Sequence, residues 1–200
     1  NARAADVADA IRAAVTRHET LRTRITRHGE VLELALNRPE DLDIGFVDAS
    51  GAADGDEAAG AVTAEVFGNH IPVESPWLFR AKVVALPGGD AAAVMAANHF
   101  ISDAGSRNIL LQEIQDALDR KAGRAVAERP PSLSYNAFSL GERHFLEGAQ
   151  GARLIDYWRR WYGRQPAMHA PSGPVMAWGT GTRIVNNFTI PRPVLEKVRA

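Results

Sequence analysis

Cysteine is absent from the 200 residues of this sequence. Within them, disulfide frameworks, thiolate zinc sites, iron–sulfur clusters and cysteine nucleophiles are therefore excluded. The lack of cysteine also fits a reducing compartment, so we expect a cytoplasmic protein.

Net charge and long apolar runs are scarce as well. Lys and Arg total 23 against 24 Asp and Glu, which leaves a net charge of −1. Such a chain has no overall attraction for phosphate backbones or anionic lipids. The longest apolar run, residues 91–97, is far shorter than the roughly 20 residues of a membrane-spanning helix. We expect no nucleic-acid partner, no membrane association and no signal peptide.

Several common site motifs are missing too. No two of the six histidines have the i, i+4 spacing that places both imidazoles on one helical face, so we expect no metal site. No glycine-rich phosphate loop, no G-x-G-x-x-G after a strand and no G-x-S-x-G elbow is present. The sequence therefore gives no support for nucleotide binding through these glycine-rich motifs, or for a serine hydrolase with this nucleophile elbow.

The composition that remains is that of an ordinary globular protein. Hydrophobic residues make up 46%, charged residues 24%, and the mean hydropathy is −0.20. A chain of this length can bury a core of its own, as one domain or one large lobe.

Hydrophobic periodicity predicts alternating helices and strands. The three-to-four-residue spacing of apolar side chains predicts helices over Ala4–His18, Asp56–Phe67, Ser106–Ala122, Tyr135–Glu147 and Gln150–Tyr162, and a short one from Pro191. Alternation and turn signals predict strands over Leu21–Ile25, Val31–Leu36, Ile44–Val47, Trp77–Leu86, Ala91–Ala97 and Thr182–Ile190. We expect an α/β lobe in which a mixed sheet is flanked by helices.

The same patterns predict further details of three segments and one capping residue. Residues 91–97 are small and apolar on both faces, which predicts a central strand covered on each side. Ser106 is available to cap the helix that follows. Residues 123–132 and 166–181 are rich in polar residues, Gly or Pro, so we expect a linker and a loop there.

His99 is the histidine in the most site-like position. It follows the end of the apolar strand, and a carboxylate, Asp103, comes four residues later, just before a helix. An imidazole there can act as a general base near neutral pH. The alternative is a structural histidine, because polar residues at strand ends are common. Asp103 is open to the same two interpretations, a second catalytic group or a carboxylate that holds the turn.

Other candidates have simpler interpretations. Arg22 and Arg24 alternate with apolar residues, so we expect a solvated face rather than contacts with an acidic partner. Trp158 and Trp161 have helical spacing beside Leu154, which favours core packing over an acyl-chain site.

Four segments together resemble the condensation domains of nonribosomal peptide synthetases, in the chloramphenicol acetyltransferase-like superfamily. Residues 98–104, Asn-His-Phe-Ile-Ser-Asp-Ala, are similar to the family's HHxxxDG signature, and residues 17–24 to its RHExLRT stretch. Residues 75–80 are similar to its PLxR segment, and Tyr135 through Tyr157-Trp158 to its YxDYAxW…YW helices. The four segments occur in the family's order and spacing over about residues 5–163.

The resemblance implies two similar lobes with a tunnel between them. Residues 1–181 would be the N-terminal lobe, and residues 182–200 would begin the crossover into a C-terminal lobe outside this chain. The chain would bind no cofactor itself but would act on the phosphopantetheine arms of peptidyl or acyl carrier proteins, beside an adenylation domain. His99 would be catalytic, and Asp103 would be structural, held by an arginine supplied mainly by the other lobe.

Two departures from the signature accompany the resemblance. Asn98 replaces the first histidine, whose role in the family is structural, and an asparagine can still form local hydrogen bonds. Ala104 replaces the glycine, which adds a methyl near the thioester where a positive φ would disfavour alanine. Gly105 is the neighbour that could supply the flexible position instead. A condensation-like platform without catalysis, and a free-standing acyltransferase, are therefore alternatives to an active condensation enzyme.

Overall fold

The computed structural model describes residues 3–164. The chain divides into two units, residues 1–149 and residues 150–200, which are described separately below. The helices are α1 (Ala4–Arg17), α2 (Gly55–Gly68), α3 (Ala104–Lys121), α4 (Tyr135–Glu147) and α5 (Ala149–Tyr162). The strands are β1 (Thr23–His28), β2 (Val31–Leu36), β3 (Ile44–Asp48), β4 (Phe79–Ala85) and β5 (Ala91–Ala97).

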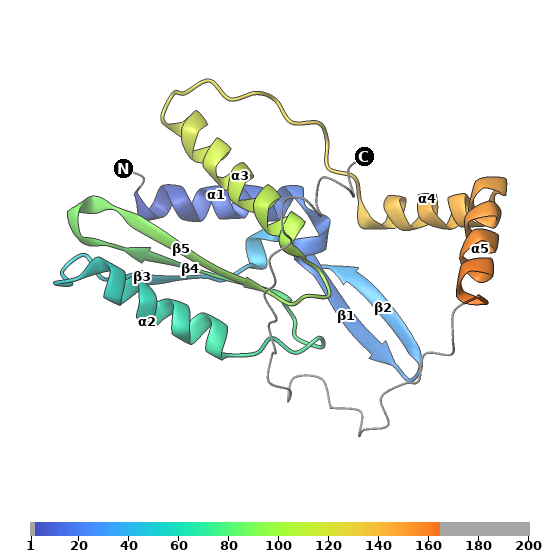
Figure 1. The fold of residues 1–200 in the computed structure, drawn as a ribbon. Helices are drawn as coiled ribbons and strands as arrows, with labels where there is room; N and C mark the ends of the chain where they lie inside the picture. Colours follow the sequence, from blue (N-terminus) through green and yellow to red (C-terminus); the bar gives the residue numbers. More distant parts are fainter. Residues whose placement is uncertain (1–2, 165–200) are drawn as a thin grey trace, which may run out of the picture. The chain divides into compact units, whose positions relative to one another are not determined.

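The first unit is built around a three-stranded mixed sheet in the order β3-β4-β5 (Figure 1). β3 pairs with β4 in parallel, and β4 pairs with β5 in an antiparallel hairpin. A second, separate hairpin consists of β1 and β2, with Gly29 at φ 63° in its turn. This arrangement confirms the expected α/β fold with a mixed sheet flanked by helices.

Alternation along β4 divides its side chains between two apolar layers. Ala81 and Val83 are buried with α1 and α3, whereas Val84 is buried against Val62 and Val66 of α2. Figure 1 shows the same arrangement, with α2 on one face of the sheet and α1 and α3 on the other. Because a strand presents successive side chains to opposite faces, one short strand can join two cores.

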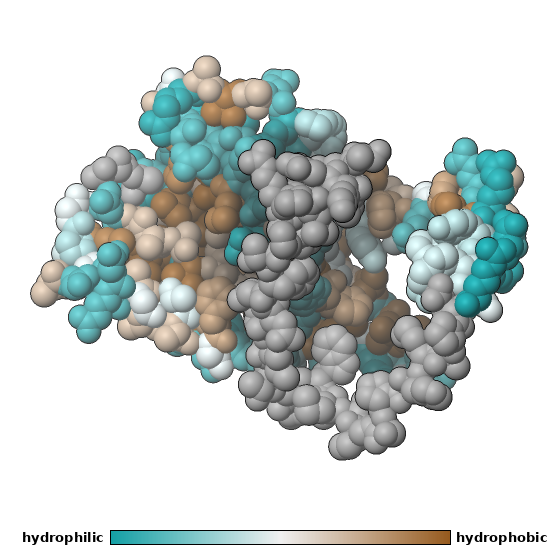
Figure 2. Space-filling model, in the orientation of Figure 1, coloured by the Kyte–Doolittle hydropathy of each residue, from teal (hydrophilic) through white to brown (hydrophobic). Residues whose placement is uncertain are grey.

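The expectation for residues 91–97 was partly wrong. β5 does have helices on both faces, since Met95 packs into the α1–α3 layer and Val94 into the α2 layer. Within the described residues, however, β5 is an edge strand and β4 is the central one. Figure 2 shows apolar residues gathered over this part of the sheet, between α3 and α2. A strand covered by helices on both faces is apolar on both faces, whether it pairs with one neighbouring strand or with two.

Other expected boundaries shift by a few residues. Residues 19–22 form a 3₁₀ turn, so β1 begins at Thr23 rather than Leu21. The linker after α3 carries no helix or strand, as expected. The predicted loop over 166–181, the strand over 182–190 and the helix from Pro191 lie outside the described residues. No helix within residues 3–164 combines the length and apolarity needed to cross a membrane.

In the second unit, the structure describes residues 150–164, which include all of α5 but its first residue. Trp158 and Trp161, which we expected in the core, are 50% and 44% exposed. Their rings pack edge to face at 5.8 Å, and Trp158 packs in the same way on Tyr157 at 5.3 Å. Within the described part of this unit, the aromatic stripe is therefore a surface cluster.

Candidate active site

The candidate site is the turn that joins β5 to α3, and Asn98 anchors its first half. The Asn98 backbone N–H donates to the Leu78 carbonyl at 2.8 Å, which continues the strand pairing by one residue. Its side-chain Nδ2 donates to the carbonyl of Ile71 at 2.7 Å, and its Oδ1 accepts from the Phe100 N–H at 2.8 Å. These bonds tie the turn both to the sheet and to the loop at Ile71.

Asp103 anchors the second half of the turn as the N-cap of α3. Its Oδ1 accepts hydrogen bonds from the backbone N–H and the hydroxyl of Ser106, both at 2.7 Å. Asp103, and not Ser106 as we expected, is therefore the cap, and Ser106 is its partner inside the helix. No lysine or arginine within residues 3–164 forms an ion pair with Asp103, so the described structure holds this carboxylate by capping alone.

His99 lies between these two anchors and is exposed. Its neighbour Phe100 is exposed as well, whereas Ile101, two residues on, is buried in the core. Ile101 thus fixes the underside of the turn, while His99 lies at the surface of the described residues. Within residues 3–164 no group of three or more His, Asp or Glu side chains could hold a metal ion.

The conformations of Ala104 and Gly105 differ from the expectation. Both residues belong to the first turn of α3, and neither has a positive φ. A Cβ on Gly105 would lie 3.4 Å from Asp103 Oδ1, which is an ordinary contact. The backbone here therefore does not require glycine at either position, and Ala104 introduces no backbone strain.

Arg22 was also misjudged from the sequence. It is half-buried, and its guanidinium donates to the carbonyls of Val15 at 3.2 Å and Asn37 at 3.0 Å. These bonds close the chain around the end of α1, so Arg22 has a structural role. Arg24 is exposed, as expected.

A charged network at the end of α1 was not found from the sequence. Arg17 Nε and His18 Nε2 contact the two carboxylate oxygens of Glu113 on α3, at 3.1 Å and 2.8 Å. Glu113 occupies the buried stripe of α3 beside Ile114, and a charged residue at such a position is the one local signal that could have revealed the network.

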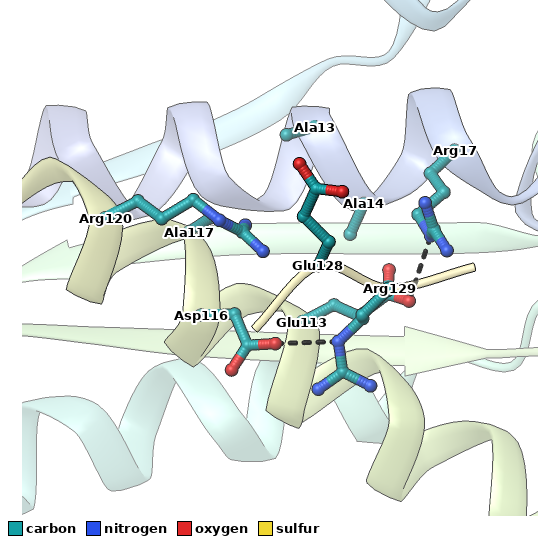
Figure 3. Close-up of a pocket in the computed structure, with 9 residues that line it drawn as sticks. All are labelled: Ala13, Ala14, Arg17, Glu113, Asp116, Ala117, Arg120, Glu128 and Arg129. Atoms are coloured by element: carbon teal, nitrogen blue, oxygen red, sulfur yellow. Dashed lines mark hydrogen bonds and ion pairs between the residues drawn. The ribbon is translucent and has the colours of Figure 1, made fainter. Parts of the chain in front are cut away.

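A cavity of about 350 Å³ lies beside this network, between α1, α3 and the linker. Figure 3 shows its charged side chains and two ion pairs, Arg17–Glu113 and Arg129–Asp116. None of its lining residues comes from the turn that carries His99. The cavity is therefore separate from the candidate active site.

The match to a family model settles what kind of chain carries this turn. The model of the condensation domain matches residues 2–171. The chain belongs to the condensation domain family. Condensation domains are acyl-transferring enzymes that act with carrier proteins bearing phosphopantetheine.

Individual relatives agree with this assignment. The chain is 27% identical over 200 residues to the nonribosomal peptide synthetase kk1B of Curvularia clavata, an alignment that covers 97% of this chain and 2% of that protein. It is 25% identical over 165 residues to a linear gramicidin synthase of Brevibacillus parabrevis, covering 79% of this chain and 2% of that protein. The chain thus spans a small part of these curated relatives.

Solved structures of condensation domains share the fold. A domain that mediates chain release from the enacyloxin polyketide synthase superposes with a TM-score of 0.72 at 32% identity, over 82% of this chain and 32% of that one. VibH, a condensation enzyme of nonribosomal peptide synthesis, superposes with a TM-score of 0.66 at 15% identity, over 80% of this chain and 37% of that one. This member of the condensation domain family therefore spans about a third of each of these two solved chains.

The cap of α3 leads to a stability prediction for Asp103. Hydrogen bonds from the Ser106 backbone, and then from its hydroxyl, lower the pKa of Asp103 from its ordinary value of 3.8. A carboxyl whose pKa is lowered by folding contributes stability above the unfolded-state pKa, and that contribution is lost as the pH falls through the folded-state pKa. Asp103→Ala should therefore lower the melting temperature by a few degrees at pH 7.

Differential scanning calorimetry at pH 7 and at pH 3 tests this prediction. The difference between wild type and Asp103→Ala should shrink at the lower pH, because pH 3 lies below the ordinary pKa of 3.8 and protonation of Asp103 then favours the unfolded wild-type chain. Equal melting temperatures at pH 7 would contradict a capping role.

Proposed function

We propose that this chain supplies the histidine-bearing lobe of an enzyme that transfers an acyl group from a carrier-bound thioester to a carrier-bound amine. The observation that carries the proposal is the position of His99, exposed on a turn that Asn98 and Asp103 hold at both ends. This is the placement that a general base needs to reach a substrate while its backbone stays fixed.

The step conserves atoms and charge. The amine nitrogen attacks the thioester carbonyl carbon, a C–N bond forms and the C–S bond breaks. The proton lost by the amine goes to His99 and then to the departing thiolate of the phosphopantetheine arm. Alternatively, His99 orients the amine while that proton passes directly to the departing thiolate. Asn98 and Asp103 take no proton in this scheme, and they keep the turn in place.

The proposal extends to the parts outside the described chain. Residues 1–181 would form the N-terminal lobe, and residues 182–200 would begin the crossover into a C-terminal lobe. Donor and acceptor carrier proteins and an adenylation domain would be the partners, and the reaction would take place in the cytoplasm. The identity to nonribosomal peptide synthetases supports this organisation.

Chain release is a second candidate function. It is favoured by the 32% identity to the domain that mediates chain release from the enacyloxin polyketide synthase. In that case the acceptor need not be an amine held on a carrier protein.

The chemistry of the product distinguishes the two. The full-length parent protein is incubated with an acyl-loaded donor carrier and an aminoacyl-loaded acceptor carrier. Carrier-bound and free products are then separated and treated with alkaline hydroxylamine, which cleaves thioesters and oxygen esters but not amides. We expect a new amide that survives this treatment. A product found only free in solution, or one cleaved as an oxygen ester, would instead support chain release.

Ala104 bears on whether the domain is active or is a platform without catalysis. The φ at this position is not positive, so Ala104→Gly in the full-length protein should change turnover by no more than about twofold. We expect a stability loss of about 0.4–1 kcal/mol, because glycine adds entropy to the unfolded chain. Initial rates on the same loaded carriers measure the effect. A gain of about tenfold or more, worth about 1.4 kcal/mol of barrier, would show that the methyl obstructs the thioester.

A further inference from the structure

The reaction proposed above makes no use of Glu113, although this residue is buried. Its side chain is 9% exposed, and within residues 3–164 no other charged residue is buried. An ionised carboxylate out of water is costly unless cations and hydrogen-bond donors surround it. Arg17 supplies a cation and a hydrogen-bond donor to one carboxylate oxygen, and His18 Nε2 contacts the other.

The same two residues also hold the linker that follows α3. The Arg17 guanidinium donates to the carbonyl of Pro130, and His18 Nδ1 lies 3.2 Å from the hydroxyl of Ser132. Since an ionised carboxylate can only accept, His18 Nε2 is the nitrogen that donates to Glu113. The end of α1 thus joins two segments about a hundred residues away in the sequence, α3 and its linker.

Glu113 lies on the helix that begins at the candidate site. It follows the Asp103 cap by ten positions on α3, which places it about 15 Å along a continuous helix axis. The apolar contacts of α3 with α1 are non-directional, so they tolerate small sliding and rotation. Charge-assisted hydrogen bonds to two oxygens are directional, so they fix both the height and the rotation of α3.

We propose that His18 and Arg17, through Glu113, are positioning residues for His99. They set the register of α3 against α1, and α3 sets the Asp103 end of the turn, whose other end Asn98 ties to the sheet. This inference rests on the proposed role of His99 in acyl transfer. Arg17, His18 and Glu113 would then position the base without touching the substrate or the reacting atoms.

Two substitutions at His18 test the inference in the full-length protein. His18→Ala removes one bond to Glu113 but leaves Arg17 to compensate the carboxylate, so the protein should still fold. We expect kcat to fall about tenfold while KM for the donor carrier stays within about twofold, because a misplaced base impairs the reaction more than binding. His18→Gln retains a side-chain N–H donor and should keep kcat within about twofold of wild type.

Asp116→Asn is the matched control. Asp116 also lies on α3 and forms an ion pair, with Arg129 at 2.6 Å, but its partner belongs to the linker and not to α1. Weakening this pair should leave kcat within about twofold of wild type, since the register of α3 against α1 is unchanged. A loss of kcat as large as that of His18→Ala would overturn the inference.

Amide hydrogen exchange of a peptide covering residues 98–106 provides a readout that does not depend on activity. Exchange should be faster in His18→Ala than in wild type and unchanged in His18→Gln and Asp116→Asn. Unchanged exchange in His18→Ala would overturn the positioning role, whatever happens to kcat. If His18→Ala behaves as wild type while His99→Ala is inactive, only the positioning role fails. If wild type forms no product, the proposed function fails and exchange alone decides the positioning role.

Discussion

Purified residues 1–200 should form no condensation product from loaded donor and acceptor carriers, even when they are folded. His99 and Phe100 are exposed, so residues 3–164 do not enclose a substrate at the base proposed above. The chain also spans about a third of the solved condensation-domain chains described above. Positioning two substrates accounts for much of the rate of such a reaction, so half of the site should not suffice.

The experiment compares the fragment with the full-length parent at equal concentration. Mass spectrometry follows the acceptor carrier, and circular dichroism with a thermal melt establishes that the fragment is folded. Product from the folded fragment above the enzyme-free background would contradict the account, because the described lobe would then contain the whole active site.

His99→Ala in the full-length protein should reduce kcat by about 10²–10⁴-fold, the usual contribution of a general acid–base group. The melting temperature should hardly change, because the His99 side chain is exposed. Steady-state kinetics on loaded carriers and calorimetry measure the two quantities separately.

His28→Ala is the control for removal of an imidazole. His28 is exposed at the β1–β2 turn, and its partner Glu33 is exposed too, so we expect neither kcat nor melting temperature to change. If His99→Ala keeps more than about a tenth of the wild-type kcat, His99 is not the base and the scheme proposed above is wrong.

Short-range patterns predicted most of the secondary structure. Helices α1, α2, α4 and α5 lie within one or two residues of the expected spans, since each is specified by its own apolar spacing. The edge position of β5 was missed because helices on both faces make an edge strand as apolar as a central one. The start of α3 was missed because the sequence offers two residues that can cap a helix, Asp103 and Ser106. The backbone conformation shows that Asp103 is the N-cap and that Ser106 lies inside the helix.

The candidate site was predicted in part. His99 and Asp103 stand out because they are adjacent to a strand end and a helix start, and both features are local. The contact between His18 and Glu113 joins residues 95 apart in the sequence, and no local pattern indicates that they meet. The bonds of Arg22 to two carbonyls were hidden for the same reason, because an alternating pattern indicates the face of a residue and not its partners.

The two departures from the family signature have a physical explanation in the structure. Asn98 forms two side-chain hydrogen bonds that hold the turn, so the missing imidazole is not needed for that task. Ala104 has ordinary helical geometry at the start of α3. Neither residue distorts the turn, which favours an active enzyme over a platform that has lost catalysis.

The most direct test of the central claim, that this chain is part of an acyl-transfer enzyme, is the mass of the acceptor carrier in a single turnover of the wild-type full-length protein. The donor carrier is loaded with an isotopically labelled acyl group, the acceptor with an amino acid, and the enzyme is in excess. The account predicts that the label moves to the acceptor and that the donor returns to its free thiol form. If the donor keeps its label in the presence of a folded enzyme and a loaded acceptor, the domain is a platform and the claim is wrong.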